Sequence, residues 1–148
     1  MGARRSLEVL EKVSEVATLA GIGGKIEDEH MHFAMGFALP ENRSQVVYVR
    51  DASQNDDHKV VTIFSPCFVV KKGIFSGFSK QRALDLLRFN EQILFARYGI
   101  WENKSEVMVV ASNDHLLATL DPDELKTSAF HVAFAADAYE KKHGRDNF

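Results

Sequence analysis

The chain has 148 residues, of which 45% are hydrophobic and 26% charged, and these values are usual for one soluble globular domain. The formal net charge of -3, with no basic stripe, argues against a nucleic-acid-binding protein. No apolar run approaches the roughly 20 residues of a membrane span, and the N-terminal stretch has no uninterrupted apolar segment of a secretory signal. The single cysteine, Cys67, cannot form an intrachain disulfide. We therefore expect one domain over residues 1–148, in the cytoplasm, without a membrane or nucleic-acid partner.

The first predicted element is an amphipathic helix between Ser6, a possible N-cap, and Gly21, which can end it. The stretch "HMHFAMGFAL" then alternates with period two and predicts a strand. Three strands are predicted in succession, over residues 30–39, 44–51 and 59–70. The last of them should be broken or bent at Pro66, because proline cannot donate a ladder hydrogen bond. Short links between these strands favour an antiparallel meander.

Ser79 can cap a second helix, "KQRALDLLRFNEQI". After Ile93 the chain either continues this helix or begins a strand, and the β-favouring residues up to Trp101 favour the strand. "ENKS" (102–105) resembles a hairpin connection into a further strand, "EVMVVAS". Asp121-Pro-Asp-Glu124 then predicts the start of a last helix. One stripe of that helix is apolar: Leu125, Ala129, Val132, Ala133, Ala136 and Tyr139.

The predicted order of elements is α-β-β-β-α-β-β-α. This order predicts an α+β domain with an antiparallel five-stranded sheet and helices packed on it.

Few residue patterns point to chemistry. "GIGGKI" (21–26) matches neither a phosphate-binding loop nor a dinucleotide-binding turn, and it follows a helix rather than a strand. No nucleophile, paired-carboxylate or triad signature is present, so we expect neither an enzyme nor a cofactor. His30 and His32 lie on the same predicted strand face and could share a metal or a small molecule. Two ligands alone do not make a zinc site.

Both later helices carry more apolar surface than one contact needs. In the second helix, Ala83, Leu84, Leu87 and Leu94 cluster on one side, while Leu86, Phe89 and Ile93 cluster roughly opposite. A helix that is apolar on two sides must be covered on two sides. In the last helix, Phe130 and Phe134 lie outside the main stripe. These side chains cover either the sheet edge and a loop or another chain. The candidates for a partner or dimer contact are Leu86, Phe89, Ile93, Phe130 and Phe134.

Four features of the C-terminal half resemble the YbjN family of bacterial proteins, which has a type III secretion chaperone-like fold. They are the Leu-x-x-Asn piece at Leu87 to Asn90, the Phe-Ala-Arg-Tyr passage at 95–98, the hairpin, and the Leu-Asp-Pro-Asp-Glu-Leu entry to the last helix. The resemblance implies a twisted antiparallel sheet and a homodimer. It also implies a non-enzymatic protein that holds a client segment against apolar patches, partly by strand addition.

From the residues and the resemblance together we expect a non-enzymatic protein-binding module, chaperone-like or regulatory, that acts as a homodimer. It should present apolar helix and strand surface to a partner protein. The alternative is a small-molecule or metal-binding protein that uses the strand face of His30 and His32.

Overall fold

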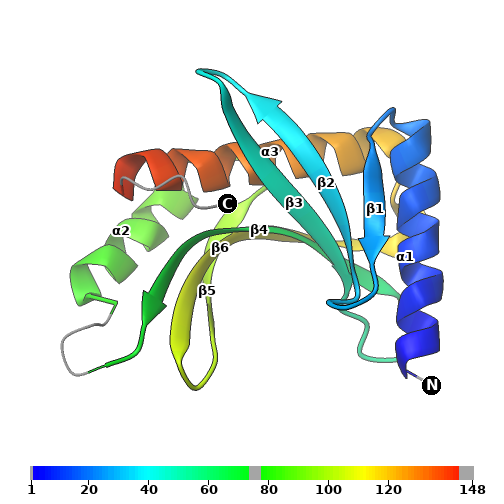
Figure 1. Cartoon of the computed structure of the whole chain (residues 1–148), viewed down its shortest axis with the longest axis horizontal. Coiled ribbons are helices and arrows are strands. Elements are labelled where there is room, and N and C mark those ends of the chain that lie inside the picture. Colours follow the sequence, from blue (N-terminus) through cyan, green and yellow to red (C-terminus); the bar gives the residue numbers. More distant parts are fainter. Residues whose placement is uncertain (1, 74–77, 144–148) are drawn as a thin grey trace.

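The computed structural model describes residues 2–73 and 78–143. These residues form an α+β structure with three α-helices and one open, antiparallel six-stranded sheet (Figure 1). The helices are α1 (Gly2–Leu19), α2 (Lys80–Asn90) and α3 (Pro122–His143). The strands are β1 (Gly24–Glu27), β2 (His32–Leu39), β3 (Arg43–Asp51), β4 (Val60–Lys71), β5 (Arg97–Glu102) and β6 (Glu106–Leu116). In the sheet they follow the order β1-β2-β3-β4-β6-β5.

The prediction of five strands was wrong by one, because the structure adds β1 just after the first helix, where no strand was predicted. This strand pairs with β2, from Gly24 opposite Met35 to Glu27 opposite His32. A Cβ atom at Gly24 would lie only 2.5 Å from the ring of Phe33. Glycine is therefore required where β1 approaches β2. A four-residue strand with a glycine has almost no local pattern, so the sequence alone could not reveal it.

Helix α1 ends as predicted but begins earlier than predicted. Ser6 is not its N-cap, since the helix starts at Gly2 and the Ser6 hydroxyl donates to Asp51 Oδ2 at 3.0 Å. Gly21 has a φ of 72°, and the N–H of Ile22 donates to the carbonyl of Ala17 at 2.9 Å. This hydrogen bond and the left-handed glycine form a Schellman motif, and they confirm the prediction that Gly21 ends the helix.

The strand predicted over residues 30–39 begins only at His32. Met31 has a φ of 51° and lies in the turn between β1 and β2, together with His30. The predicted irregularity of β4 is confirmed, because its register against β6 shifts between Pro66 and Phe68.

The boundary left open after Ile93 is now defined. The Ser79 hydroxyl accepts from the N–H of Arg82 at 3.2 Å, as a cap should, but α2 stops at Asn90 and β5 starts at Arg97. The predicted cap of α3 is also confirmed. The N–H of Glu124 donates to Asp121 Oδ1 at 2.8 Å, and the whole predicted apolar stripe of α3 is buried.

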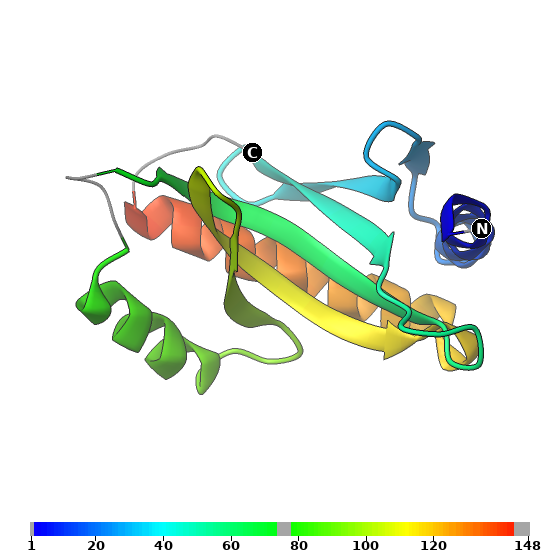
Figure 2. The ribbon, with the colours of Figure 1, turned by 90° about the horizontal axis from the view of Figure 1, so that it is seen from below.

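The helices differ in how they join the sheet. α3 packs along β3, β4 and β6, and α1 packs on β1, β2 and β3 as well as on α3. α2 mainly contacts β5 and stands at the opposite end of the molecule from α1 (Figures 1 and 2). Only Leu86 of α2 is buried. None of the helices in the described residues is both long and apolar enough to span a membrane.

A buried polar cluster connects α3 to the sheet. Arg43 of β3 donates to Asp137 of α3 and lies 3.5 Å from Glu140 Oε2. Gln45 Nε2 donates to Ser65 Oγ at 2.9 Å and to Glu140 Oε1 at 3.3 Å. Buried charges need such partners, so this cluster fixes the direction in which α3 crosses β3 and β4.

Candidate functional site

An apolar groove separates α3 from the chain that follows α2, and we call it the α2–α3 groove. Its main part has a volume of about 340 Å³ and is lined by Gln92, Ile93, Leu94, Tyr98, Phe130, His131, Phe134, Ala135 and Ala138. A smaller hollow of about 160 Å³ continues it past Phe89, Tyr139 and Lys142 and shares Gln92, Ile93, Tyr98 and Ala138 with it. Four lining residues of α3 are spaced four apart, at positions 130, 134, 138 and 142. At 1.5 Å per residue this row is roughly 18 Å long.

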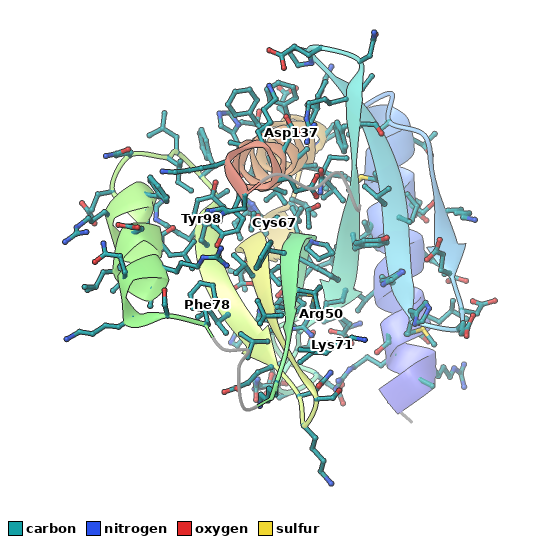
Figure 3. All side chains as sticks on the ribbon, turned by 60° about the vertical axis from the view of Figure 1, so that its left-hand side comes forward. Arg50, Cys67, Lys71, Phe78, Tyr98 and Asp137 are labelled. Atoms are coloured by element: carbon teal, nitrogen blue, oxygen red, sulfur yellow. The ribbon has the colours of Figure 1, made fainter. Side chains whose placement is uncertain are left out.

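Tyr98 joins the two walls of the groove. Its hydroxyl donates to the carbonyl of Ala135 on α3 at 2.6 Å, and its backbone pairs with the side chain of Asn90 on α2. The Tyr98 N–H donates to Asn90 Oδ1 at 2.7 Å, and Asn90 Nδ2 donates to the Tyr98 carbonyl at 3.1 Å. Figure 3 shows Tyr98 between α2 and α3. Burial raises the pKa of this tyrosine well above its ordinary value.

The Asn90 amide therefore does for β5 what the backbone of another strand would do. It supplies one donor and one acceptor to the outer edge of the sheet. The sequence held no signal for this role of Asn90. Arg88, two residues earlier in α2, lies at the surface with its Nη1 3.1 Å from Asp85 Oδ1.

Aromatic side chains stand partly in solvent along the α3 wall. Phe130 is 45% exposed and Phe134 is 54% exposed, and their rings stack with centroids 6.3 Å apart. Phe95 is 57% exposed and packs against His131 with ring centroids 4.8 Å apart. It also has a φ of 64°, which is uncommon for a residue other than glycine.

The five residues predicted as contact candidates are found in three environments. Ile93, Phe130 and Phe134 come together in the main part of the groove. Phe89 lines the smaller hollow, where Lys142 Nζ lies 4.0 Å from its ring centroid. Leu86 is only 4% exposed, so its own chain already covers it.

The structure also shows which side of α2 faces outward. The side with Leu86 faces the protein, whereas Leu84 is 37% exposed and Leu87 is 65% exposed on the other side. Leu94, which is 70% exposed, lies beyond the helix end and lines the α2–α3 groove. The sequence predicted apolar residues on two sides of the helix, but two of them, Ile93 and Leu94, lie beyond its end at Asn90. It held no signal for which of them meets the core, so Leu87, Leu94 and Phe95 were missed as candidates.

The histidine pair does not assemble a metal site. His32 Nε2 lies 2.6 Å from Glu27 Oε2, and the rings of His30 and His32 are 5.4 Å apart at their centroids. The hydrogen bond from His32 lowers the pKa of Glu27. Within residues 2–73 and 78–143, no three histidine, cysteine or acidic side chains are grouped as metal ligands would be.

A row of rings crosses the sheet face turned away from the core. Tyr48 lies between His32 and Phe64, at centroid distances of 4.3 and 5.4 Å, and Phe64 lies 4.7 Å from Trp101. The guanidinium of Arg50, which Figure 3 labels, is 4.2 Å from the Trp101 ring centroid. The rings pack on one another, and Phe64 is only 8% exposed. These rings therefore cover the sheet face that the helices leave open.

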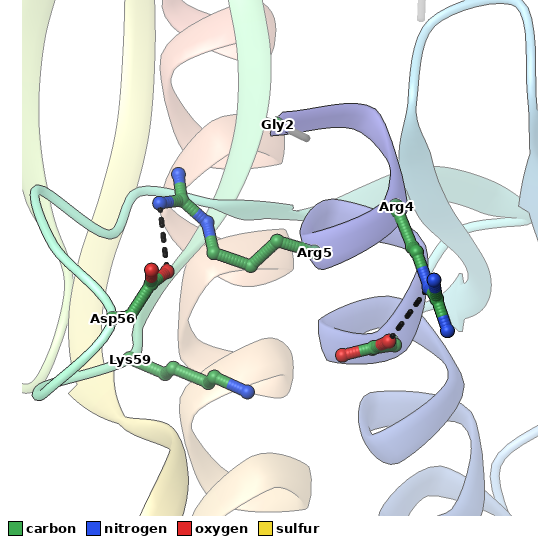
Figure 4. A pocket seen from close by; sticks show the side chains of 6 residues that line it. Gly2, Arg4, Arg5, Asp56 and Lys59 are labelled. Atoms are coloured by element: carbon green, nitrogen blue, oxygen red, sulfur yellow. Dashed lines mark hydrogen bonds and ion pairs between the residues drawn. The ribbon is translucent and has the colours of Figure 1, made fainter.

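Another hollow lies beside the start of α1 (Figure 4). Four of its charged side chains form two ion pairs, and Lys59 also lines it. Arg5 Nη1 lies 3.3 Å from Asp56 Oδ1, and Arg4 Nε lies 3.5 Å from Glu8 Oε1. Such pairs at the surface contribute little to stability and do not indicate a ligand.

Comparison with family models, with curated proteins and with solved structures found no match for this chain. The resemblance to the YbjN family therefore stays a prediction made from the residues.

Proposed function

We propose that this protein is a non-enzymatic protein-binding module, chaperone-like or regulatory, that works as a homodimer and offers apolar helix and strand surface to a partner protein. The observation that carries this proposal is the α2–α3 groove with its half-exposed Phe130 and Phe134. The element order, apart from β1, supports the type III secretion chaperone-like fold that the resemblance implies. We place the protein in the cytoplasm, in agreement with its single cysteine, Cys67, which is buried and free.

The lining of the groove favours apolar side chains over a reacting small molecule. Apart from the tyrosines, the ionisable side chains among its described lining residues are His131 and Lys142. His131 Nδ1 already lies 2.8 Å from the carbonyl of Thr127. A groove of roughly 18 Å accommodates about three turns of helix, and anchors spaced by three or four residues would meet the row on α3.

The outer edge of β5 provides the strand surface. Asn90 covers this edge only at Tyr98. Because strand groups alternate, the N–H and C=O of Ile100 point the same way as those of Tyr98, away from β6. Ile100 is 44% exposed. An extended segment of a partner can therefore add to β5 at Ile100.

Affinity capture with matched baits tests the proposal. The baits are the wild type, Phe134→Glu, and Leu19→Glu as a control at a residue that is 77% exposed on α1. We expect partners that the wild type and Leu19→Glu retain and that Phe134→Glu loses by at least about tenfold. Circular dichroism should show that all three baits are folded. Equal recovery of every protein on the three folded baits would remove the basis of the proposal.

A further inference from the structure

The amide of Asn90 takes the place of an added strand on the outer edge of β5. β5 is the last strand of the sheet, and its pairing with β6 leaves the N–H and C=O groups of Tyr98, Ile100 and Glu102 pointing outward. The side chain of Asn90 satisfies only the groups of Tyr98. Unpaired edge groups accept another strand, so this edge can bind one, and the end of α2 occupies its first position.

Few groups hold α2 against the protein. Leu86 is its one buried side chain, and α2 contacts mainly β5 (Figure 2). Phe89 is partly buried, with Lys142 Nζ 4.0 Å from its ring centroid. Leu84 and Leu87 face outward. Because α1 and α3 bury many more side chains, α2 is the helix that can leave the sheet with the smallest loss of buried surface.

A buried hydroxyl beside α2 lacks a partner. Tyr139 of α3 is 3% exposed, and its hydroxyl has no hydrogen-bond partner in the described part of the chain. Burial raises the pKa of Tyr139, and the charges of Arg82 and Asp85 on α2 also act on this pKa, so the hydroxyl lies close to α2. A buried polar group without a partner destabilises the state in which it is buried. Movement of α2 would open this hydroxyl to water.

The connection from α2 to β5 is strained at Phe95. Its φ of 64° lies in the left-handed region, which a bulky side chain rarely adopts. Phe95 lies between the end of α2 at Asn90 and the start of β5 at Arg97. Such strain persists only while the surrounding elements hold the geometry. Displacement of α2 relieves it, because a change of φ at Phe95 reorients the helix relative to β5.

We propose that α2 is a displaceable cover of the β5 edge, which an extended segment of a partner replaces by pairing with β5 from Tyr98 to Glu102. The inference rests on the proposed function, because it says how a partner reaches the strand surface of this protein. With α2 in place, a partner finds only the groups of Ile100 and Glu102. The side chains of Tyr98 and Ile100 lie on the same side of β5, so the partner segment carries apolar residues at alternate positions.

A peptide probe tests the pairing. It has the sequence of residues 106–112 and a fluorescein label, because residues 107–112 already complement β5 at its inner edge. Fluorescence anisotropy should show that Asn90→Ala binds the peptide about tenfold more tightly than the wild type does, since two hydrogen bonds of the cover are lost. Gln81→Ala, which removes another amide of α2, should bind like the wild type. Equal binding by all three proteins, or no binding by Asn90→Ala, would overturn the inference.

A proline at position 100 tests whether the peptide adds to β5. The N–H of Ile100 points away from β6, so Ile100→Pro leaves the existing sheet paired and removes a donor that an added strand needs. Circular dichroism checks that the variant is folded. In the Asn90→Ala background this change should weaken peptide binding by at least about tenfold. A peptide that binds the folded double variant as tightly as Asn90→Ala lies somewhere other than β5, and this result would refute the inference.

Hydrogen exchange tests the movement of α2 itself and does not depend on the proline variant. When the peptide saturates the wild type or Asn90→Ala, the α2 amides should exchange about tenfold faster or more, and the Ile100 N–H should exchange more slowly. The amides of α1, at the other end of the molecule, serve as the reference (Figure 1). A peptide that slows exchange in α2, or leaves it unchanged, binds without displacing the helix and would end the inference.

The inference and the proposed function can fail separately. If the peptide displaces α2 but Phe134→Glu loses no captured partner, the α2–α3 groove is not the partner contact and the inference stands. If Phe134→Glu loses partners while the peptide leaves α2 in place, the groove binds partners and the inference of a displaceable cover ends.

Discussion

Replacing Asn90 by alanine should weaken the attachment of α2 to the sheet. The change removes two hydrogen bonds, at 2.7 and 3.1 Å, between the amide of Asn90 and the backbone of Tyr98. Each is worth about 0.5–1.5 kcal/mol, and water can partly replace them at a sheet edge. We therefore expect a loss of about 1–2 kcal/mol in the free energy of unfolding. Alanine is the better helix former, so helix propensity would act in the opposite direction.

Urea unfolding followed by the fluorescence of Trp101, the only tryptophan, measures this loss. With an m-value of about 2 kcal/mol/M, the midpoint should fall by roughly 0.5–1 M. Gln92→Ala is the matched control, because Gln92 is an exposed amide just beyond the end of α2 and should change stability by less than about 0.5 kcal/mol. If both variants unfold at the same urea concentration, Asn90 does not hold α2 in the way described.

Three further changes test other parts of the fold. Gly24→Ala should lower the free energy of unfolding by about 1–3 kcal/mol, because the new Cβ meets an aromatic ring. Gly23→Ala, with open space around it, should lower it far less. Equal urea midpoints for the two variants would contradict the close approach of β1 to β2. Arg43→Leu should lower the free energy of unfolding by about 3–5 kcal/mol, because it removes the cation beside two buried carboxylates. Lys141→Leu, which removes an ion pair at the surface, should lower it by at most about 1 kcal/mol. Burial raises the pKa of Tyr139 to about 12, so the stability that its neutral form contributes should persist below the unfolded pKa of about 10 and fall as pH rises toward 12. Tyrosinate absorbance that develops fully at pH 10 in the folded protein would disagree with that burial.

The elements that were predicted correctly have strong local signals. Four residues define the start of α3, because the Asp121 side chain accepts from the Glu124 N–H and the Glu124 side chain accepts from the Asp121 N–H. The spacing of the apolar stripe defines the buried side of α3. Period two with large side chains identified β2, and proline marked the irregularity in β4. In each case the interactions that decide the structure lie within a few residues of one another along the chain.

The features that were missed depend on partners far away in sequence. β1 exists because β2 pairs with it, and its own four residues have little strand preference. Asp137 looks like a solvent-facing residue of α3 until Arg43, 94 positions away, is placed beside it. Which side of α2 faces inward depends on where β5 and α3 lie, and both come later in the chain. Sequence periodicity predicts two apolar sides without ranking them.

Helix α2 should become more ordered when a second copy covers it. The helix has 11 residues and only one buried side chain, and isolated helices of this length are marginal in water. Its Ser79 cap and the Asn90 pairs hold only its two ends. If α2 lies in the contact of the proposed homodimer, amide hydrogen exchange in α2 must slow as protein concentration rises through the dissociation constant. The amides of α1 serve as the internal reference, and Leu87→Glu should abolish the concentration dependence. Exchange in α2 that stays the same at every concentration, while the protein dimerises, would place the dimer contact elsewhere.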